Sequence, residues 1–392
     1  MIKRRIAKRN IRLFFIAPAI AAILILIMGI FDPTGVLHAH GFRAGIMKDM
    51  RQQAAGVMNI NPNLDSIILG TSVLENTSSR EAERVLGGAY ANISMSGSSF
   101  YERHFALDRL LKTQKIKTVI YSLDDNYLSQ TREHSSYPVA QYDYLYNWNT
   151  LDNIKIYQDF PIFKCLIKKE KKRKKCMSDD IMFDRPNMWM NDPNENIRFG
   201  GLDHWFAANN NQQVIDALSS ISSSAQDIAD GKQKQDDAEE ISKNIKATEK
   251  YIDDYVLSYV RNYPRTEFHL VFPPYSRIKF AQWHQGNPKY SQTHEAAIRY
   301  LAQAQKSLSN LYVYGYEDMK FIDDIANYKD TGHYHERINT MMLQSIHDKK
   351  SVITPDNAET YIATARRNAL SFDLIGLGRK IDAYLKTQKK TD

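Results

Sequence analysis

The chain has 392 residues and a formal net charge of +7, with 43% hydrophobic and 25% charged residues. This is ordinary globular composition, with enough apolar material for a sizeable core. The basic excess lies mainly at the extreme N-terminus and in residues 168–175, while the rest of the chain is roughly balanced. The charge is therefore local and not the footprint of a nucleic-acid-binding protein, so no nucleic acid is expected as a partner.

The N-terminus carries an apolar segment at residues 13–31 that contains no charged side chain. A bilayer core of ~30 Å requires about 20 helical residues, so this segment predicts a transmembrane anchor. Basic residues cluster before it, which by the positive-inside rule predicts a cytoplasmic tail at residues 1–12. A cleaved signal peptide is the alternative, but the segment ends without a small-x-small cleavage site. We therefore expect a single-pass protein of the inner membrane whose remaining chain is periplasmic or otherwise extracytoplasmic.

Residues 32–62 follow as a predicted juxtamembrane stalk, partly helical over 44–58. Beyond it, short apolar and β-rich segments predict strands. They occupy residues 65–70, 91–96, 117–123, 267–272 and 311–316. Helical patterns alternate with them, at residues 80–86, 100–111, 238–262 and 293–308. This alternation predicts an α/β three-layer sandwich around a parallel sheet of about five strands, within a domain spanning residues 63–348.

Residues 130–235 interrupt the alternation and predict a largely irregular insertion with a few helices, including a stretch rich in Asn, Gln and Ser at 209–224. Cys165 and Cys176 bracket the basic loop 168–175, and in an oxidising compartment such a pair predicts a disulfide; two unpaired thiols are the alternative. No cysteine and histidine spacing fits a zinc site, so no metal is expected. Residues 349–392 predict a C-terminal helical extension.

Two polar motifs follow the first and last predicted strands. Ser72 ends the motif Gly70-Thr71-Ser72, and Asp330 precedes His333 by three residues. Ligands of open parallel sheets bind at the carboxyl ends of the strands. An aspartate can orient an imidazole, which can then act as a base on a serine hydroxyl. Helix capping is the alternative role for either motif alone, but together they predict a catalytic triad.

These motifs resemble the SGNH (GDSL-like) hydrolase superfamily. They are most similar to its membrane-anchored branch, which includes the alginate and cell-wall O-acetylation proteins and the Dlt-type D-alanine transfer proteins. The resembling blocks lie at residues 68–72, 92–97, 271–274 and 330–333. The resemblance implies an SGNH/flavodoxin-like sheet, Ser72 as nucleophile, and an oxyanion hole that uses the backbone N–H groups of Ser72 and Gly97.

The third block departs from the family pattern. The family usually has an oxyanion-donating asparagine in a Gly-x-Asn-Asp context, whereas here Asp124 stands at the strand end and Asn126 two residues later. We treat both as candidate oxyanion or substrate-binding residues. Arg277, after the strand at 267–272, is a candidate ligand for a carboxylate or phosphate of the acceptor, with a surface arginine as the alternative.

The resemblance implies a membrane-anchored serine esterase or acyltransferase that modifies an envelope polysaccharide without a cofactor. Acetyl is the first expectation for the acyl group and D-alanyl the second. The implied partners are a membrane-bound O-acyltransferase or other acyl donor, a polysaccharide acceptor and the inner membrane. One alternative is a catalytically degenerate scaffold of a polysaccharide modification or export complex. Another is a membrane-tethered module that binds anionic lipid or polymer through residues 168–175.

Overall fold

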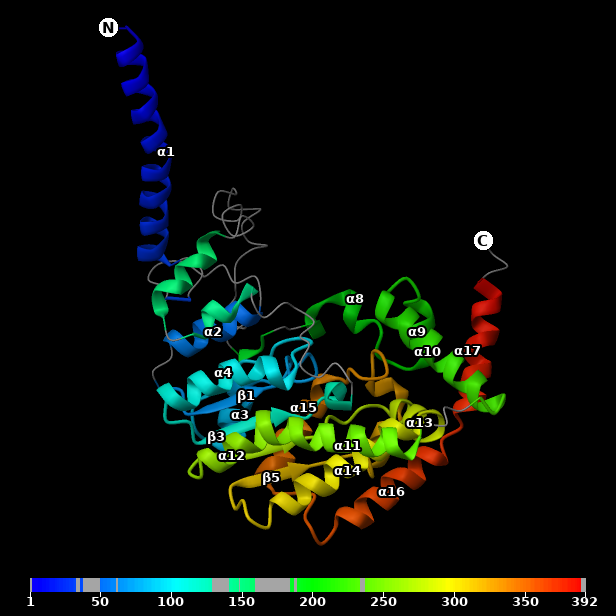
Figure 1. The fold of residues 1–392 in the computed structure, drawn as a ribbon. Coiled ribbons are helices and arrows are strands. Elements are labelled where there is room, and N and C mark those ends of the chain that lie inside the picture. The colour runs from blue at the N-terminus through cyan, green and yellow to red at the C-terminus, as the bar shows by residue number, and fades with distance from the viewer. Residues whose placement is uncertain are drawn as a thin grey trace.

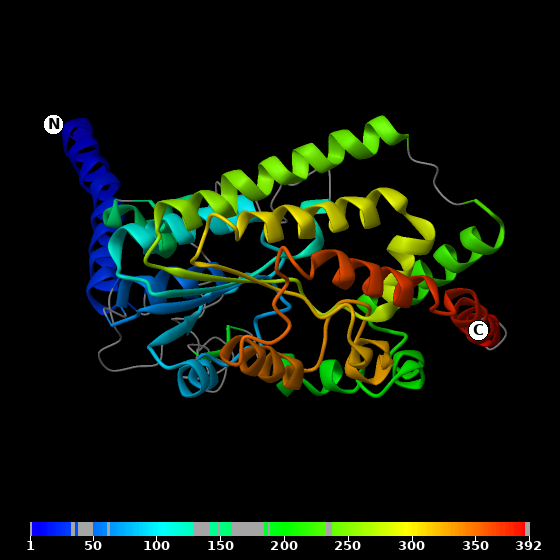
Figure 2. The same cartoon turned by 90° about the horizontal axis from the view of Figure 1, so that it is seen from below.

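The computed structural model describes residues 2–32, 36–37, 50–60, 63–128, 141–147, 149–158, 184–186, 189–232 and 237–388. A parallel sheet forms the middle of the molecule, and helices pack against both of its faces (Figures 1 and 2). The predicted α/β class with a central parallel sheet of five strands is confirmed.

The sheet has the strand order β2-β1-β3-β4-β5. The strands are β1 (Ser66–Leu69), β2 (Tyr90–Asn92), β3 (Thr118–Ser122), β4 (Glu267–Val271) and β5 (Leu311–Tyr314). Because both faces are covered by helices, strand side chains such as Ile67 and Ile68 are fully buried. The chain winds in one direction from β1 to β2 and in the other from β3 onward, so the crevice beyond the carboxyl ends of β1 and β3 is the topological switch point.

Helices connect the strands largely where the periodicity predicts them. In Figure 2, α4 (Phe100–Thr113), α11 (Ala238–Ile252) and α14 (Pro288–Ala304) cover one face of the sheet. On the other face, α3 (Ser79–Leu86) packs against α15 (Glu336–His347). The predicted helix 238–262 is continued by a π-helical turn (Asp253–Leu257) and by α12 (Ser258–Asn262). Helix α13 (Arg277–Gly286), directly after β4, was not predicted.

Capping residues fix where α3 and α4 begin. The hydroxyl of Ser78 accepts a hydrogen bond from the backbone N–H of Glu81, and the hydroxyl of Ser99 accepts one from Glu102. Both are Ser-x-x-Glu sequences, a capping pattern that satisfies otherwise unpaired N–H groups of the first turn. These caps direct each helix away from the carboxyl edge of the sheet.

The described part of the insertion is mostly helical. Its described elements are η3 (Asp143–Leu145), η4 (Thr150–Gln158), η6 (Trp189–Asn191), α8 (Pro193–Asn196), α9 (Leu202–Ala207) and α10 (Gln212–Ala229). Most of the Asn-, Gln- and Ser-rich stretch 209–224 lies in α10. Val214, Leu218 and Ile221 form a buried stripe at helical spacing, and α10 packs through this face against α17 (Leu374–Gln388). Cys165, Cys176 and the basic loop lie outside the described residues.

The segments predicted as a stalk and as a C-terminal extension both make contacts with the α/β domain. Helix α2 (Met50–Ile60), within the predicted stalk, buries Ala54, Ala55 and Val57 in the core. At the other end, Val352 forms an antiparallel bridge with Tyr314 of β5, before α16 (Ala358–Leu370) begins. Both segments therefore belong to the packed α/β body.

Helix α1 (Ile2–Phe31) extends away from the sheet (Figure 1). Among the described residues, no helix combines the length and the apolar character needed to cross a bilayer. The anchor expected at residues 13–31, and the topology that depends on it, stay predictions.

Candidate active site

The turn after β1 places Ser72 at the switch point. The backbone at Gly70 packs closely against β3, because a Cβ atom at this position would lie 2.4 Å from Ser122 Oγ. The backbone N–H of Gly70 donates to Ser94 Oγ at 3.1 Å, and its carbonyl accepts from the backbone N–H of Met95 at 2.9 Å. The loop after β2 therefore holds the turn that presents the half-buried Ser72 to the crevice.

The structure brings the three predicted triad residues together across 261 positions of sequence. Ser72 Oγ lies 2.8 Å from His333 Nε2, and His333 Nδ1 lies 2.7 Å from Asp330 Oδ2. With Nδ1 protonated and donating to the carboxylate, Nε2 is the acceptor of the serine proton. This is the serine–base–orienter arrangement that activates a hydroxyl nucleophile.

Asp330 is fixed independently of the histidine ring. Its Oδ1 atom accepts hydrogen bonds from the backbone N–H groups of Gly332 and His333, both at 2.8 Å. Burial alone would raise the pKa of this carboxyl, but the adjacent His333 and the two backbone donors hold its pKa well below its ordinary value of 3.8. Asp330 is therefore an ionised, immobile partner for the imidazole.

The loop that carries His333 is closed on itself and packed from outside. Tyr328 and Tyr334 form an antiparallel bridge around it, and the Tyr328 hydroxyl donates to the carbonyl of Pro274 at 2.8 Å. Trp189, from the insertion, packs edge-to-face against the His333 ring, with ring centroids 6.3 Å apart. Neither tyrosine nor Trp189 was predicted to belong to the site, because only the folded chain brings them near Ser72.

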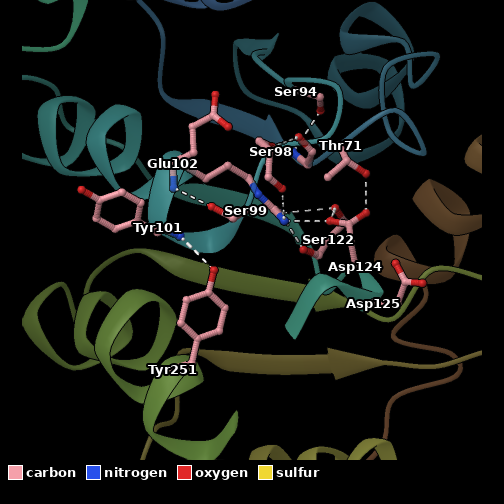
Figure 3. A network of polar contacts seen from close by, with 12 residues as sticks. Thr71, Ser94, Ser98, Ser99, Tyr101, Glu102, Ser122, Asp124, Asp125 and Tyr251 are labelled. Atoms are coloured by element: carbon pink, nitrogen blue, oxygen red, sulfur yellow. Dashed lines mark hydrogen bonds and ion pairs between the residues drawn. The ribbon is translucent and has the colours of Figure 1, made fainter. Parts of the chain in front are cut away.

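Asp124 lies beneath the nucleophile turn and accepts hydrogen bonds from three sides. Thr71 Oγ1 donates to its Oδ1 at 2.5 Å, and Ser122 Oγ donates to its Oδ2 at 2.6 Å (Figure 3). The fully buried Arg103 donates to the same Oδ2 at 2.8 Å. Arg103 also donates to the carbonyls of Ser122 and Ser98, at 2.7 and 3.3 Å. The network thus ties together the loops that follow β1, β2 and β3.

The predicted oxyanion residues lie in different surroundings. Gly97 lines the same crevice as Ser72 and has a φ of 64°, a left-handed conformation that suits glycine; its role as a donor stays a prediction. A carboxylate supplies no donor to an oxyanion, and the oxygens of Asp124 already accept bonds from Thr71, Ser122 and Arg103, although Asp124 also lines the crevice beside Ser72. Asn126 lies in η1 (Asp125–Leu128), and its side chain is outside the described structure.

Arg277 is a correction to the sequence-based assignment. It is buried, and it donates from Nε to Asp323 at 2.6 Å and from its terminal nitrogens to the carbonyls of Glu317 and Met319. It fixes the chain after β5 and does not line the crevice. The cation that does is Lys279, two residues further along α13, which pairs with Asp125 at 2.6 Å and lies over the Tyr275 ring.

Two cavities meet at the triad. The smaller, of about 320 Å³, is lined by residues of the sheet edge: Thr71, Ser72, Val73, Gly97, Asp124, Asp125, Tyr275, Lys279, Asp330, Thr331, Gly332 and His333. The larger, of about 430 Å³, shares Ser72, Gly97 and His333 with it. Its other lining residues are Glu75, Ser96, Trp189, Asp192, Glu195, Gln213 and Lys329. A reacting group bound at Ser72 can therefore extend in two directions.

Fold and site together define a doubly wound α/β protein that carries a Ser-His-Asp relay at its switch point. Comparison with protein-family models and with curated proteins finds no match to this chain. Among the described residues, no group of His, Cys, Asp or Glu side chains is arranged to hold a metal ion. The geometry of the site and the motif resemblance are therefore the grounds for proposing a function.

Proposed function

We propose that the protein is a serine-dependent esterase or O-acyltransferase that acts through an acyl-enzyme on Ser72. The observation that supports this best is the unbroken hydrogen-bonded relay from Ser72 through His333 to Asp330, at 2.8 and 2.7 Å. A capping serine or a structural histidine would need no such alignment. Two cavities that share the nucleophile also suit a reaction with a donor and an acceptor.

In the first step, Ser72 Oγ attacks the carbonyl carbon of an ester while its proton passes to His333 Nε2. The resulting imidazolium is stabilised by the ionised Asp330 at 2.7 Å from Nδ1. Backbone N–H groups near Ser72 and Gly97 are the proposed donors to the oxyanion. Collapse of the tetrahedral intermediate breaks the bond to the leaving alcohol, which takes the proton from Nε2 and leaves an acyl group on Ser72.

In the second step, His333 removes a proton from an incoming hydroxyl, which attacks the acyl-enzyme. The bond between the acyl carbon and Ser72 Oγ breaks, and Oγ recovers its proton from Nε2. Water as the incoming hydroxyl gives an esterase, and a sugar hydroxyl gives an acyltransferase. The motif resemblance favours an envelope polysaccharide as acceptor, acetyl as acyl group, and a membrane-bound O-acyltransferase or other acyl donor as partner.

A fluorophosphonate probe tests this proposal, since it reacts only with an activated serine. We expect the full-length protein in detergent to be labelled, and the Ser72→Ala and His333→Ala variants to remain unlabelled. Ser96→Ala is the matched control, because this serine lines the larger cavity without joining the relay, and it should be labelled like the wild type. Absence of labelling in protein with a cooperative unfolding transition would overturn the enzyme proposal and favour the scaffold alternative.

A further inference from the structure

The larger cavity is built by a different part of the chain from the chemistry it adjoins. Trp189, Asp192, Glu195 and Gln213 all come from the insertion, whereas the smaller cavity is lined by the sheet edge and α13. Both cavities include Ser72 and His333. The insertion therefore adds a second compartment to a site whose reacting groups already exist without it.

The insertion wall is held in place by buried ionic contacts. Lys329 Nζ lies 2.5 Å from Glu195 Oε2 and 4.0 Å from the centre of the Trp189 ring. Arg198, fully buried behind the wall, also pairs with Glu195 and donates to Gln213 Oε1 at 2.9 Å. These contacts position Glu195 and Gln213 in the lining of the cavity, so the compartment is preformed.

The lining has a negative formal charge. Among the described lining residues, Glu75, Asp192 and Glu195 contribute carboxylates, and Lys329 contributes the one ammonium. Arg198 behind the wall offsets one of these carboxylates, so the described lining keeps a negative formal charge. Carboxylate and amide oxygens accept hydrogen bonds from hydroxyl and ammonium groups, whereas a second carboxylate brought beside them is repelled.

We propose that this cavity binds the carbohydrate portion of the substrate, and that it selects neutral or amine-bearing sugars over uronic acids. The inference rests on the proposed function, because it assigns a ligand class to a compartment of that site. Ser72 and His333 both line this cavity, and the alcohol oxygen of an ester must lie beside these two side chains. Its hydrogen-bonding side chains suit a polyol, and the smaller cavity is left for the acyl side.

Protection of Ser72 from a fluorophosphonate tests the selection directly. The full-length protein would be labelled in the presence of matched tetrasaccharides: cello-oligosaccharide (neutral), chitosan oligosaccharide (amine-bearing) or oligogalacturonate (anionic). We expect the first two to slow labelling at concentrations on the order of tenfold below those needed for oligogalacturonate, because like charges repel across the cavity.

Two variants place the effect in the cavity. Asp192→Asn removes a lining charge and keeps a residue type that can cap α8, where the Asp192 side chain accepts from the N–H of Asn194. This variant should reduce the difference between the concentration of oligogalacturonate that slows labelling and the concentrations of the other two tetrasaccharides that do so. Asp203→Asn, an equal change on the exposed surface of α9, should leave the preference unchanged.

Each outcome separates the two proposals. If Ser72 is labelled but no tetrasaccharide slows the reaction, or oligogalacturonate protects as well as the neutral sugar, the ligand assignment is wrong and the serine chemistry stands. An equal response of Asp192→Asn and Asp203→Asn would also contradict it. Failure of the wild type to label overturns both proposals together.

Discussion

The carboxyl edge of the sheet and the insertion that walls it hold their functional residues by different means. At the sheet edge, Asp330 is fixed by N–H groups two and three residues away. In the insertion, the contacts span long stretches of chain: Trp205 Nε1 donates to the carbonyl of Tyr328 at 3.0 Å, and Lys329 pairs with Glu195. The first region depends on local backbone geometry and the second on tertiary side-chain packing.

The difference implies a division of labour. Substitutions at the sheet edge should act on the chemical step, because the relay is complete within the strand-end loops. Substitutions in the insertion should act on ligand selection and on stability, because its side chains line one cavity and pack on the His333 loop. Substitutions in each region therefore test this division.

The largest expected effect is that of Asp330→Asn on the chemical step. The amide cannot stabilise the imidazolium, and its NH₂ group would favour the wrong tautomer of His333, so we expect the rate of serine acylation to fall by about 10⁴-fold. The measurement is the second-order rate of fluorophosphonate labelling. A loss of less than about tenfold would show that His333 acts without its orienting partner.

The pH dependence of the stability of Asp330→Asn tests whether Asp330 is ionised and paired in the native state. Because the pKa of Asp330 is held below its ordinary value of 3.8, this carboxylate stabilises the native state above that value and loses its contribution as the pH falls through the lower folded pKa. The difference in unfolding free energy between wild type and Asp330→Asn should therefore shrink below about pH 4. A difference that is constant with pH would contradict the ionised, paired state.

Asp124→Asn should have the next largest effect, on stability. It leaves Arg103 buried without its counter-ion, and breaking such a pair costs about 3–5 kcal/mol. Urea unfolding measures this cost, with Lys117→Ala as control. Lys117 directly precedes β3, the strand that Asp124 follows, and it pairs with Asp65. Its side chain is 74% exposed, so the loss of this pair should cost less than about 1 kcal/mol.

A double replacement tests whether the Asp124 network also positions the nucleophile. Arg103→Met with Asp124→Leu removes both charges and should recover part of the stability. Thr71 Oγ1 then has lost its acceptor, so labelling of Ser72 should stay slow. Recovery of both stability and labelling rate would show that the network stabilises the fold and does not orient the serine turn.

Lys329→Met is predicted to have a smaller effect that depends on pH. Burial lowers the pKa of Lys329 to about 8 from its ordinary 10.5. Between these values the unfolded chain binds a proton that the folded chain does not, so the wild type gains stability as the pH rises. We expect a gain of about 2–3 kcal/mol over the variant between pH 8 and 10. Lys112→Met is the control: pairing with Asp108 raises the pKa of that lysine, so this variant should parallel the wild type.

The sheet could be predicted from the sequence because its code is local. Strands buried on both faces, such as 66–69 and 118–122, have apolar centres, and turn-forming residues follow them. The triad was predicted for the same reason, since Ser72 and His333 each follow a strand and strand ends converge. The structure confirms their proximity, which the motifs alone could not establish.

The rest depended on contacts that no local pattern encodes. Helix α10 is rich in serine, a residue common in loops, and only the spacing of the buried Val214, Leu218 and Ile221 indicates a helix. The positions of Asp124 and Arg277 after strands suggested ligand-binding roles, but Asp124 binds the buried Arg103, and Arg277 is itself buried and binds Asp323. Trp189 belongs to the insertion and packs against the His333 ring, a contact that only the folded chain reveals.

Removal of residues 2–27 should have the smallest effect on the chemistry and extends the comparison to a third region. Large apolar side chains of α1 are exposed, among them Phe14 and Leu26, while Asp32 beyond them accepts from the Tyr157 hydroxyl at 2.5 Å. A truncation that keeps Asp32 should therefore leave the labelling rate of Ser72 within about twofold. It should also release the protein from the membrane fraction, because apolar burial is what would hold α1 there.

If the full-length chain already fractionates without membranes, the predicted anchor is wrong. If the truncated chain loses labelling, α1 contributes to the site, and the separation between chemistry and attachment fails.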